Sequence, residues 1–173
     1  MTPLPPPFGD GALVGWRLDQ ERFRAGWDSG EGAYLVGGRW NSRGVRAVYC
    51  ALDPATAILE VAVHKGFTAL DIAPHWLTSL RVTALDRVHV VDPATLPNPN
   101  WLRPGIPSAG QQAYGDDLLK RHGFIVIPSV VSTHSWNLIF VASVVAGGYA
   151  LCGQERFALD TRLHPPSTLG TAP

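Results

Sequence analysis

A chain of 173 residues suits one domain with a hydrophobic core and leaves little room for two. Its 14 lysines and arginines balance its 14 aspartates and glutamates, so no overall charge recruits nucleic acid or an anionic membrane surface. Charged residues make up only 16% of the chain, so we expect an apolar surface that is partly covered by a partner or by a second copy in a homodimer.

One folded domain is predicted over residues 12–164, between a Pro-rich arm at 1–11 and a flexible tail at 165–173. The arm lacks the basic start and apolar run of a signal peptide. The longest apolar stretch, residues 138–151, is too short and too interrupted by glycine to span a bilayer. The sequence therefore predicts a cytoplasmic protein without membrane contact, in which Cys50 and Cys152 are buried, reduced thiols.

Several segments are rich in apolar and β-branched residues and are bounded by turn residues, which is the pattern of strands. These segments are residues 13–18, 33–40, 47–52, 79–92, 124–132 and 137–145. The segment at 79–92 is long enough for two strands.

Two helices are predicted between the strands. The first begins with Asp53 as N-cap and Pro54 at its first position, and it ends at Gly66. The second covers residues 111–123 and ends at Gly123, after a Pro-rich segment that is mostly loop. Because the helices fall between groups of strands, we predict an α+β fold with a mixed or antiparallel central sheet.

The segment GGRWNSRG, residues 37–44, places Arg39 directly after two flexible glycines. Arginine presents a planar fork of donors to a phosphate or carboxylate, and Gly37 and Gly38 let backbone amides approach the same anion. The alternatives are a surface arginine in a hairpin and an arginine paired with a carboxylate.

Glu60 stands among apolar residues in the segment AILEVAV. An unpaired buried carboxylate is costly, so a carboxylate in this setting has a partner or serves a function. The alternatives are a pair with His64, one helical turn away, and simple exposure at the edge of the sheet.

Ser129 and Tyr49 are further candidates. Ser129 follows a proline at the end of an apolar strand, where a hydroxyl can line a cleft, although serine is also common in turns. Tyr49 is either a core aromatic or a platform for a flat ligand. The sequence has no G-x-S-x-G elbow, no Walker or G-x-G-x-x-G loop and no metal-binding histidine spacing, so no metal site is predicted.

Residues 27–66 resemble the central signature of the RES domain family, the toxin halves of bacterial toxin–antitoxin pairs. The resemblance extends through YGDDLLKRHG and VIPSVVS to Asn137. The family's arginine, glutamate and serine fall on Arg39, Glu60 and Ser129, its strand tyrosine falls on Tyr49, and Arg17 and Asn137 occupy two further substrate-binding positions. The chain departs from the family at THSWN, residues 133–137, where a carboxylate usually precedes the asparagine, and an Asn-Pro pair that usually follows is missing.

The resemblance implies an ADP-ribosyltransferase-like fold, with mixed or antiparallel sheets and a few short helices around an NAD-binding cleft. It implies that NAD⁺ is the substrate rather than a cofactor, and that the nicotinamide–ribose bond is cleaved by hydrolysis or phosphorolysis. Two alternatives stay open, an ADP-ribosyltransferase that modifies a protein and an inactive nucleotide-binding module. The implied partner is an Xre-type antitoxin.

The resemblance also suggests roles for the site residues. Arg39 would hold the diphosphate or an adjacent ribose, and Tyr49 would pack against the nicotinamide or ribose. Glu60 would stabilise the oxocarbenium-like charge, and Ser129 would position the ribose or the incoming nucleophile.

Overall fold

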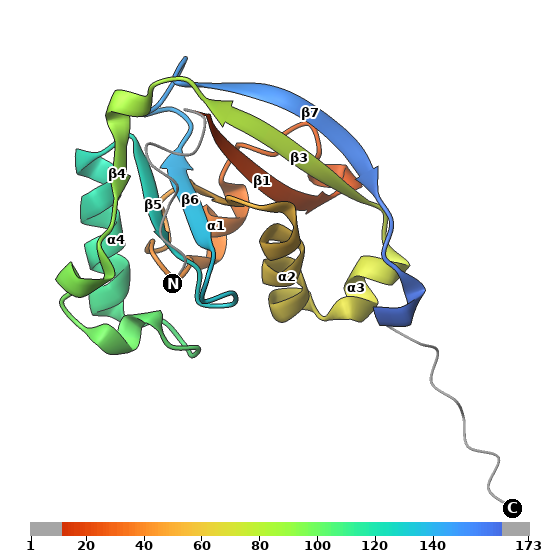
Figure 1. Cartoon of the computed structure of the whole chain (residues 1–173), viewed down its shortest axis with the longest axis horizontal. Coiled ribbons are helices and arrows are strands. Elements are labelled where there is room, and N and C mark those ends of the chain that lie inside the picture. The colour runs from red at the N-terminus through yellow and green to blue at the C-terminus, as the bar shows by residue number, and fades with distance from the viewer. Residues whose placement is uncertain (1–11, 164–173) are drawn as a thin grey trace, which may run out of the picture.

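A computed structural model describes residues 12–163 of the chain (Figure 1). The predicted arm at 1–11 and the predicted tail at 165–173 lie outside the described residues. The described part contains one seven-stranded sheet, with strand order β4-β5-β6-β2-β1-β3-β7. The strands are β1 (Leu13–Gln20), β2 (Ala47–Ala51), β3 (His75–Val82), β4 (Val88–Val90), β5 (Phe124–Pro128), β6 (Trp136–Val141) and β7 (Tyr149–Phe157). The α-helices in the same residues are α1 (Glu31–Val36), α2 (Pro54–Lys65), α3 (Phe67–Ile72) and α4 (Ala109–Arg121).

The sheet consists of two halves that meet between β1 and β2. Strand β1 pairs with β3 along its whole length, and β2 pairs with β6 along its whole length. By contrast, β1 and β2 are joined by a single residue pair, Trp16 with Ala51. The half formed by β1, β3 and β7 runs in a different direction from the half formed by β4, β5, β6 and β2 (Figure 1). This junction is where the two halves can leave space for a ligand.

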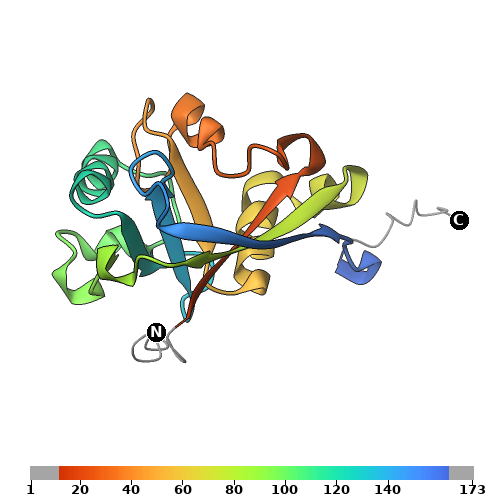
Figure 2. The same cartoon turned by 90° about the horizontal axis from the view of Figure 1, so that it is seen from above.

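The helices cover different parts of the sheet. Helix α4 packs against β5 and β6. Helix α2 lies beside β1 (Figure 1, Figure 2) and also packs against β2. Helix α2 begins as predicted, because the Asp53 side chain accepts a hydrogen bond from the Thr56 amide at 2.8 Å. It ends at Gly66, whose positive φ of 76° favours glycine.

The core forms on both faces of the central strands. On one face, Phe124, Leu138 and Phe140 pack with residues of β1 and β3. On the other face, Ile125 and Ile139 pack against Leu118 and Leu119 of α4, among others. Alternate residues of β5 and β6 therefore enter different clusters, which explains why these strands are apolar without interruption.

The mixed α+β class is confirmed, with a largely antiparallel sheet in which, among the described strands, only β4 and β5 pair in parallel. The predicted strand at 33–40 is wrong. Residues 31–36 form the short helix α1, which starts after Gly30 in a left-handed conformation and ends at Gly37. A side chain at residue 30 would bring its Cβ within 2.4 Å of the Arg46 backbone, so only glycine allows the chain to turn there.

Two elements that the sequence did not predict are β7 and α3. Strand β7 is the outer strand of its half of the sheet and is largely exposed, so it lacks the alternation that marks a half-buried strand. Cys152 lies on β7 and is exposed, contrary to the prediction, whereas Cys50 is buried as predicted. Within residues 12–163, no helix has the length and apolar character needed to cross a membrane.

Candidate active site

Two adjoining hollows lie at the junction of the two half-sheets. Their volumes are about 460 and 270 Å³, and the larger one is within the range of small-molecule sites. Both are lined by Tyr49 of β2, Glu60 and His64 of α2, and Asn137 of β6. Arg39 lines the larger hollow and Arg17 lines the smaller one. The structure therefore brings five of the six sequence-predicted site residues to one cleft.

Glu60 projects from α2 into both hollows. Its Oε1 accepts hydrogen bonds from the Ser129 hydroxyl at 3.0 Å and from Asn137 Nδ2 at 2.9 Å. Both bonds end on one oxygen, so the other oxygen is the one that a ligand in the cleft can meet. The carboxylate is half-buried rather than enclosed in apolar core, and His64 is exposed on the next turn. Glu60 is thus held by Ser129 and Asn137, and neither of the two alternative interpretations describes it.

Ser129 lies behind Glu60 rather than in the cleft. The residue is 3% exposed and does not line either hollow. Its hydroxyl donates to Glu60 and accepts from the backbone amides of Val131 at 3.2 Å and Ser132 at 3.1 Å. Ser129 therefore does not face the cleft itself and acts on it by holding the Glu60 carboxylate. The resemblance suggested a direct contact with the ribose or the nucleophile instead.

The turn that carries Arg39 is fixed by Tyr49 and Asn41. The Tyr49 hydroxyl accepts from the Trp40 amide at 3.0 Å and donates to Asn41 Oδ1 at 2.7 Å. A Cβ at Gly38 would lie 2.6 Å from the Tyr49 hydroxyl, so glycine is required for this close approach. Burial raises the pKa of Tyr49, which keeps the phenol protonated as a donor. Tyr49 therefore shapes the cleft as well as lining it.

Asn41 is a residue that the sequence reasoning missed. It is fully buried, and its Nδ2 lies within hydrogen-bonding distance of the carbonyls of Ala33, Ser42 and Val45. A buried amide with this many partners fixes the path of the chain on both sides of the turn. The sequence feature that pointed to Asn41 was its position two residues after Arg39, in the segment GGRWN.

The Arg39 guanidinium contacts a loop between β4 and α4, and Gly105 of this loop also lines the larger hollow. It donates to the Gly105 carbonyl at 2.9 Å and to the Arg103 carbonyl at 3.4 Å. These partners are neutral carbonyls, so the alternative of a carboxylate partner is wrong. Partial burial lowers the pKa of Arg39, and interactions with Glu60 and Tyr49 act in the opposite direction. The group remains a cation at neutral pH and is available to an anionic ligand.

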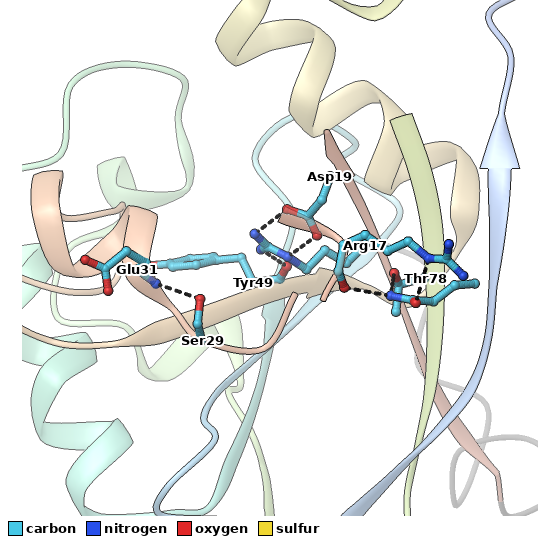
Figure 3. Close-up of polar contacts among 8 residues, drawn as sticks. Arg17, Asp19, Ser29, Glu31, Tyr49 and Thr78 are labelled. Atoms are coloured by element: carbon cyan, nitrogen blue, oxygen red, sulfur yellow. Dashed lines mark hydrogen bonds and ion pairs between the residues drawn. The ribbon is translucent and has the colours of Figure 1, made fainter. Parts of the chain in front are cut away.

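Arg17 and Asp19 are among the residues that line the smaller hollow, and Figure 3 shows the contact between them. Arg17 Nε and Nη2 donate to the two oxygens of Asp19, each at 2.7 Å. The third nitrogen, Nη1, donates to the Tyr49 carbonyl at 3.0 Å. Arg17 thus links β1 to β2 where main-chain pairing is sparse. Asp19 was also missed, although its position two residues along the same strand places it on the same face as Arg17.

A carboxylate between two guanidinium groups suits a ligand with both negative and positive charge. Arg39, whose partners are neutral carbonyls, can face phosphate oxygens, and Glu60 can stabilise a cationic centre beside it, whereas the charge of Arg17 is balanced by Asp19. Among residues 12–163, no three His, Cys, Asp or Glu side chains come together in a group that could hold a metal ion.

Comparison with known proteins finds one matching family and several relatives. The model of the RES domain matches residues 14–160. A protein named Toxin Res from Photorhabdus laumondii is 32% identical over 133 residues, which is 73% of this chain and 80% of the relative. A Toxin Res from Pseudomonas putida is 30% identical over 139 residues, 78% of this chain and 91% of the relative. A Sphingobium protein named Prs ADP-ribosylating toxin is 32% identical over 133 residues, 72% of this chain and 79% of the relative.

Among solved structures, the M. tuberculosis MbcT–MbcA toxin–antitoxin complex contains a chain of similar fold. The TM-score is 0.67, with 21% sequence identity, and the match covers 85% of each chain. At this identity the similarity supports the fold of the described residues.

Proposed function

Because the chain belongs to the RES domain family of toxins, we propose that it depletes cellular NAD⁺ by cleaving the bond between nicotinamide and ribose. The observation that supports this proposal is the position of Glu60. Its carboxylate lies where the two hollows meet, with Arg39 on one side and Arg17 on the other.

In the proposed reaction, the bond from ribose C1′ to the nicotinamide nitrogen breaks, and its electron pair leaves with nicotinamide. The ribose then carries positive charge, as at other glycosidic centres. The free oxygen of Glu60 stabilises this charge and orients a ribose hydroxyl. Water attacks C1′ and loses a proton, which gives ADP-ribose, or phosphate attacks and gives ADP-ribose 1-phosphate.

The neighbouring residues bind and orient the substrate. Arg39 exchanges its carbonyl partners for oxygens of the diphosphate, because a charge-assisted bond is stronger than a bond to a neutral carbonyl. The Tyr49 ring packs against the nicotinamide or ribose. Arg17 contacts the substrate from the smaller hollow, and Asn137 and Ser129 hold Glu60 in place.

The substitution Glu60→Gln tests the proposal. The amide keeps the shape of the side chain and loses its charge, so NAD⁺ turnover should fall on the order of a hundredfold, since removal of one such electrostatic contact costs roughly 3 kcal/mol. Nicotinamide release by the purified protein, with and without phosphate, measures the effect and identifies the acceptor. Near-normal turnover by a folded Glu60→Gln variant would sink the assignment.

The first alternative is transfer of ADP-ribose to a protein, which the name of the Sphingobium relative favours. The same cleft would serve both reactions, because they share the cleavage step. NAD⁺ labelled in the adenosine half separates them: label bound to protein indicates transfer, and label in free ADP-ribose indicates hydrolysis. The second alternative, an inactive nucleotide-binding module, predicts NAD⁺ binding without nicotinamide release.

The chain is a toxin of a toxin–antitoxin system, so its partner is an antitoxin. We propose that an antitoxin of the Xre type covers the mouth of the larger hollow. Val36 and Val63 line this hollow and are 75% and 61% exposed, and Ile106, between two lining residues, is 98% exposed. An apolar rim of this kind is typical of a surface that a protein partner covers.

A further inference from the structure

Arg39 is held between two segments from different parts of the chain. Its backbone follows the turn at Gly37 and Gly38, and its guanidinium donates to the carbonyls of Arg103 and Gly105. The direction of the guanidinium in the cleft therefore depends on where both segments lie.

The first turn of α4 anchors both of these segments through two neighbouring glutamines. Gln112 Nε2 donates to the Gly38 carbonyl at 2.9 Å. Gln111 Nε2 donates to the Trp101 carbonyl at 3.1 Å, at the start of the second segment. Gln111 is buried at 2% exposure, whereas Gln112 is partly exposed and lines the larger hollow. Of the two anchors, Gln112 is the one beside the ligand space.

The contact of Gln112 falls on the peptide unit from which Arg39 starts. The carbonyl of Gly38 and the amide of Arg39 belong to the same planar group, so a bond to that carbonyl fixes the plane of the peptide. The amide of Gln112 also packs directly on the turn, because a Cβ at Gly37 would lie only 3.2 Å from Nε2. Gln112 therefore restricts the backbone of Arg39 without touching its side chain.

We propose that Gln112 is a positioning residue that sets the direction of the Arg39 guanidinium toward the anionic part of the ligand. The inference rests on the proposed function, in which Arg39 binds the diphosphate of NAD⁺. Loss of the Gln112 hydrogen bond lets the peptide before Arg39 rotate. The guanidinium is then directed toward the diphosphate in a smaller fraction of molecules. The reacting centre at Glu60 is unchanged, because Gln112 forms no contact with it in the described structure.

The substitution Gln112→Met tests this inference, since methionine keeps the length of the side chain and removes the donor. The control is Gln154→Met in β7, where Nε2 donates to the Arg24 carbonyl and to Thr78 Oγ1, each at 3.1 Å, and where the side chain lines neither hollow. We expect Gln112→Met to weaken the binding of ADP-ribose about fivefold, the effect of one hydrogen bond, and to leave binding of adenosine, which has no diphosphate, unchanged. The KM for NAD⁺ should rise by the same factor with kcat nearly constant. The control variant should bind both probes like the wild type.

Titration calorimetry and steady-state kinetics separate the outcomes. Equal weakening of ADP-ribose and adenosine, a fall in kcat at constant KM, or unchanged ADP-ribose affinity each overturns the role of Gln112. If the methionine variant does not fold, Gln112→Glu removes the same donor with less change of shape and should raise KM at least as much. A wild-type protein that neither binds ADP-ribose nor consumes NAD⁺ overturns the proposed function. This outcome differs from that of an active wild type whose ADP-ribose affinity is unchanged by Gln112→Met, which overturns only the role of Gln112.

Discussion

Ser129 and Glu60 act as one unit at the scale of single residues. Ser129 is buried, and its hydroxyl donates to the carboxylate that faces the ligand space. A side chain in this position affects the reaction by holding Glu60 in one rotamer. Its contribution should therefore depend entirely on the carboxylate that it holds.

We expect Ser129→Ala to lower kcat about tenfold, the approximate effect of one hydrogen bond to a charged group. In a Glu60→Gln background the same substitution should have little further effect. Thr83→Ala is the control, because it also removes a hydroxyl donor, to the Gly147 carbonyl at 3.4 Å, and Thr83 lines neither hollow. Rates of nicotinamide release from the wild type, the two single variants and the double variant test the coupling, and fully additive losses would contradict it.

The residues that belong to the sequence motif were the easier part of the site to predict. Arg39, Glu60 and Asn137 lie at one cleft, as their positions in the motif suggest. Asn41 and Asp19 were missed because their importance lies in contacts that only folding creates. An asparagine in a polar turn resembles any other turn residue until the three carbonyls around it are known.

Helix α2 shows how one element positions the site. Its N-cap, Asp53, accepts from the Thr56 amide and from the Ser135 hydroxyl, and Ser135 belongs to the loop that also carries Ser129. Partial burial of Asp53 would raise its pKa, but the hydrogen bonds from Ser135 and from Thr56 and Ala55 outweigh burial, so the pKa is lowered from 3.8. The cap therefore links α2, which carries Glu60, to the loop that carries Ser129, whose hydroxyl donates to Glu60.

Substitution of this cap should reduce stability at neutral pH. We expect Asp53→Ala to lower the free energy of unfolding by about 1 kcal/mol, the usual effect of a lost N-cap. Because the folded pKa of Asp53 is below its unfolded value of 3.8, its stabilisation is present above that pH and is lost as pH falls through the folded pKa. The difference between variant and wild type should therefore shrink in acid. Urea unfolding at pH 7 and at pH 3 tests this, and a constant difference would argue against it.

Elements with clear end signals were predicted well, and those defined by their neighbours were not. The Asp-Pro start and glycine end of α2 are local, so the sequence contains them. Strand β7 exists because β3 offers it a partner along its length, and its own residues, YALCGQERF, show no strand period. The segment at 33–36 has strand-like residues, but it lies in the helix α1, which is capped by the glycines at positions 30 and 37.

The join between the two half-sheets governs the molecule as a whole. The resemblance implied more than one sheet around a cleft, and the structure shows one sheet whose halves share a single residue pair. The strand order depends on pairings between distant segments, such as β1 with β3, which no local pattern encodes. Arg17 supplements the sparse pairing at the join through its bond to the Tyr49 carbonyl.

Arg17→Met should therefore weaken the whole fold as well as the site. It removes the link across the join and leaves the Asp19 carboxylate, 9% exposed, without its partner. We expect the free energy of unfolding to fall by about 3 kcal/mol, as when one partner of a buried pair is removed. The double variant Arg17→Met/Asp19→Leu should recover part of this loss. Chemical unfolding measures both, and no recovery in the double variant would count against the buried-charge explanation.

The two thiols of the chain give this join a chemical reporter. Cys50 lies on β2 in the core, where burial raises its pKa to about 12, whereas Cys152 is exposed on the outer strand. A thiolate attacks an electrophilic, thiol-specific reagent, so Cys152 is labelled in the folded protein and Cys50 is labelled only when the sheet opens. The labelling rate of Cys50 thus measures how often β1 separates from β2. This measurement needs no ligand and no substitution.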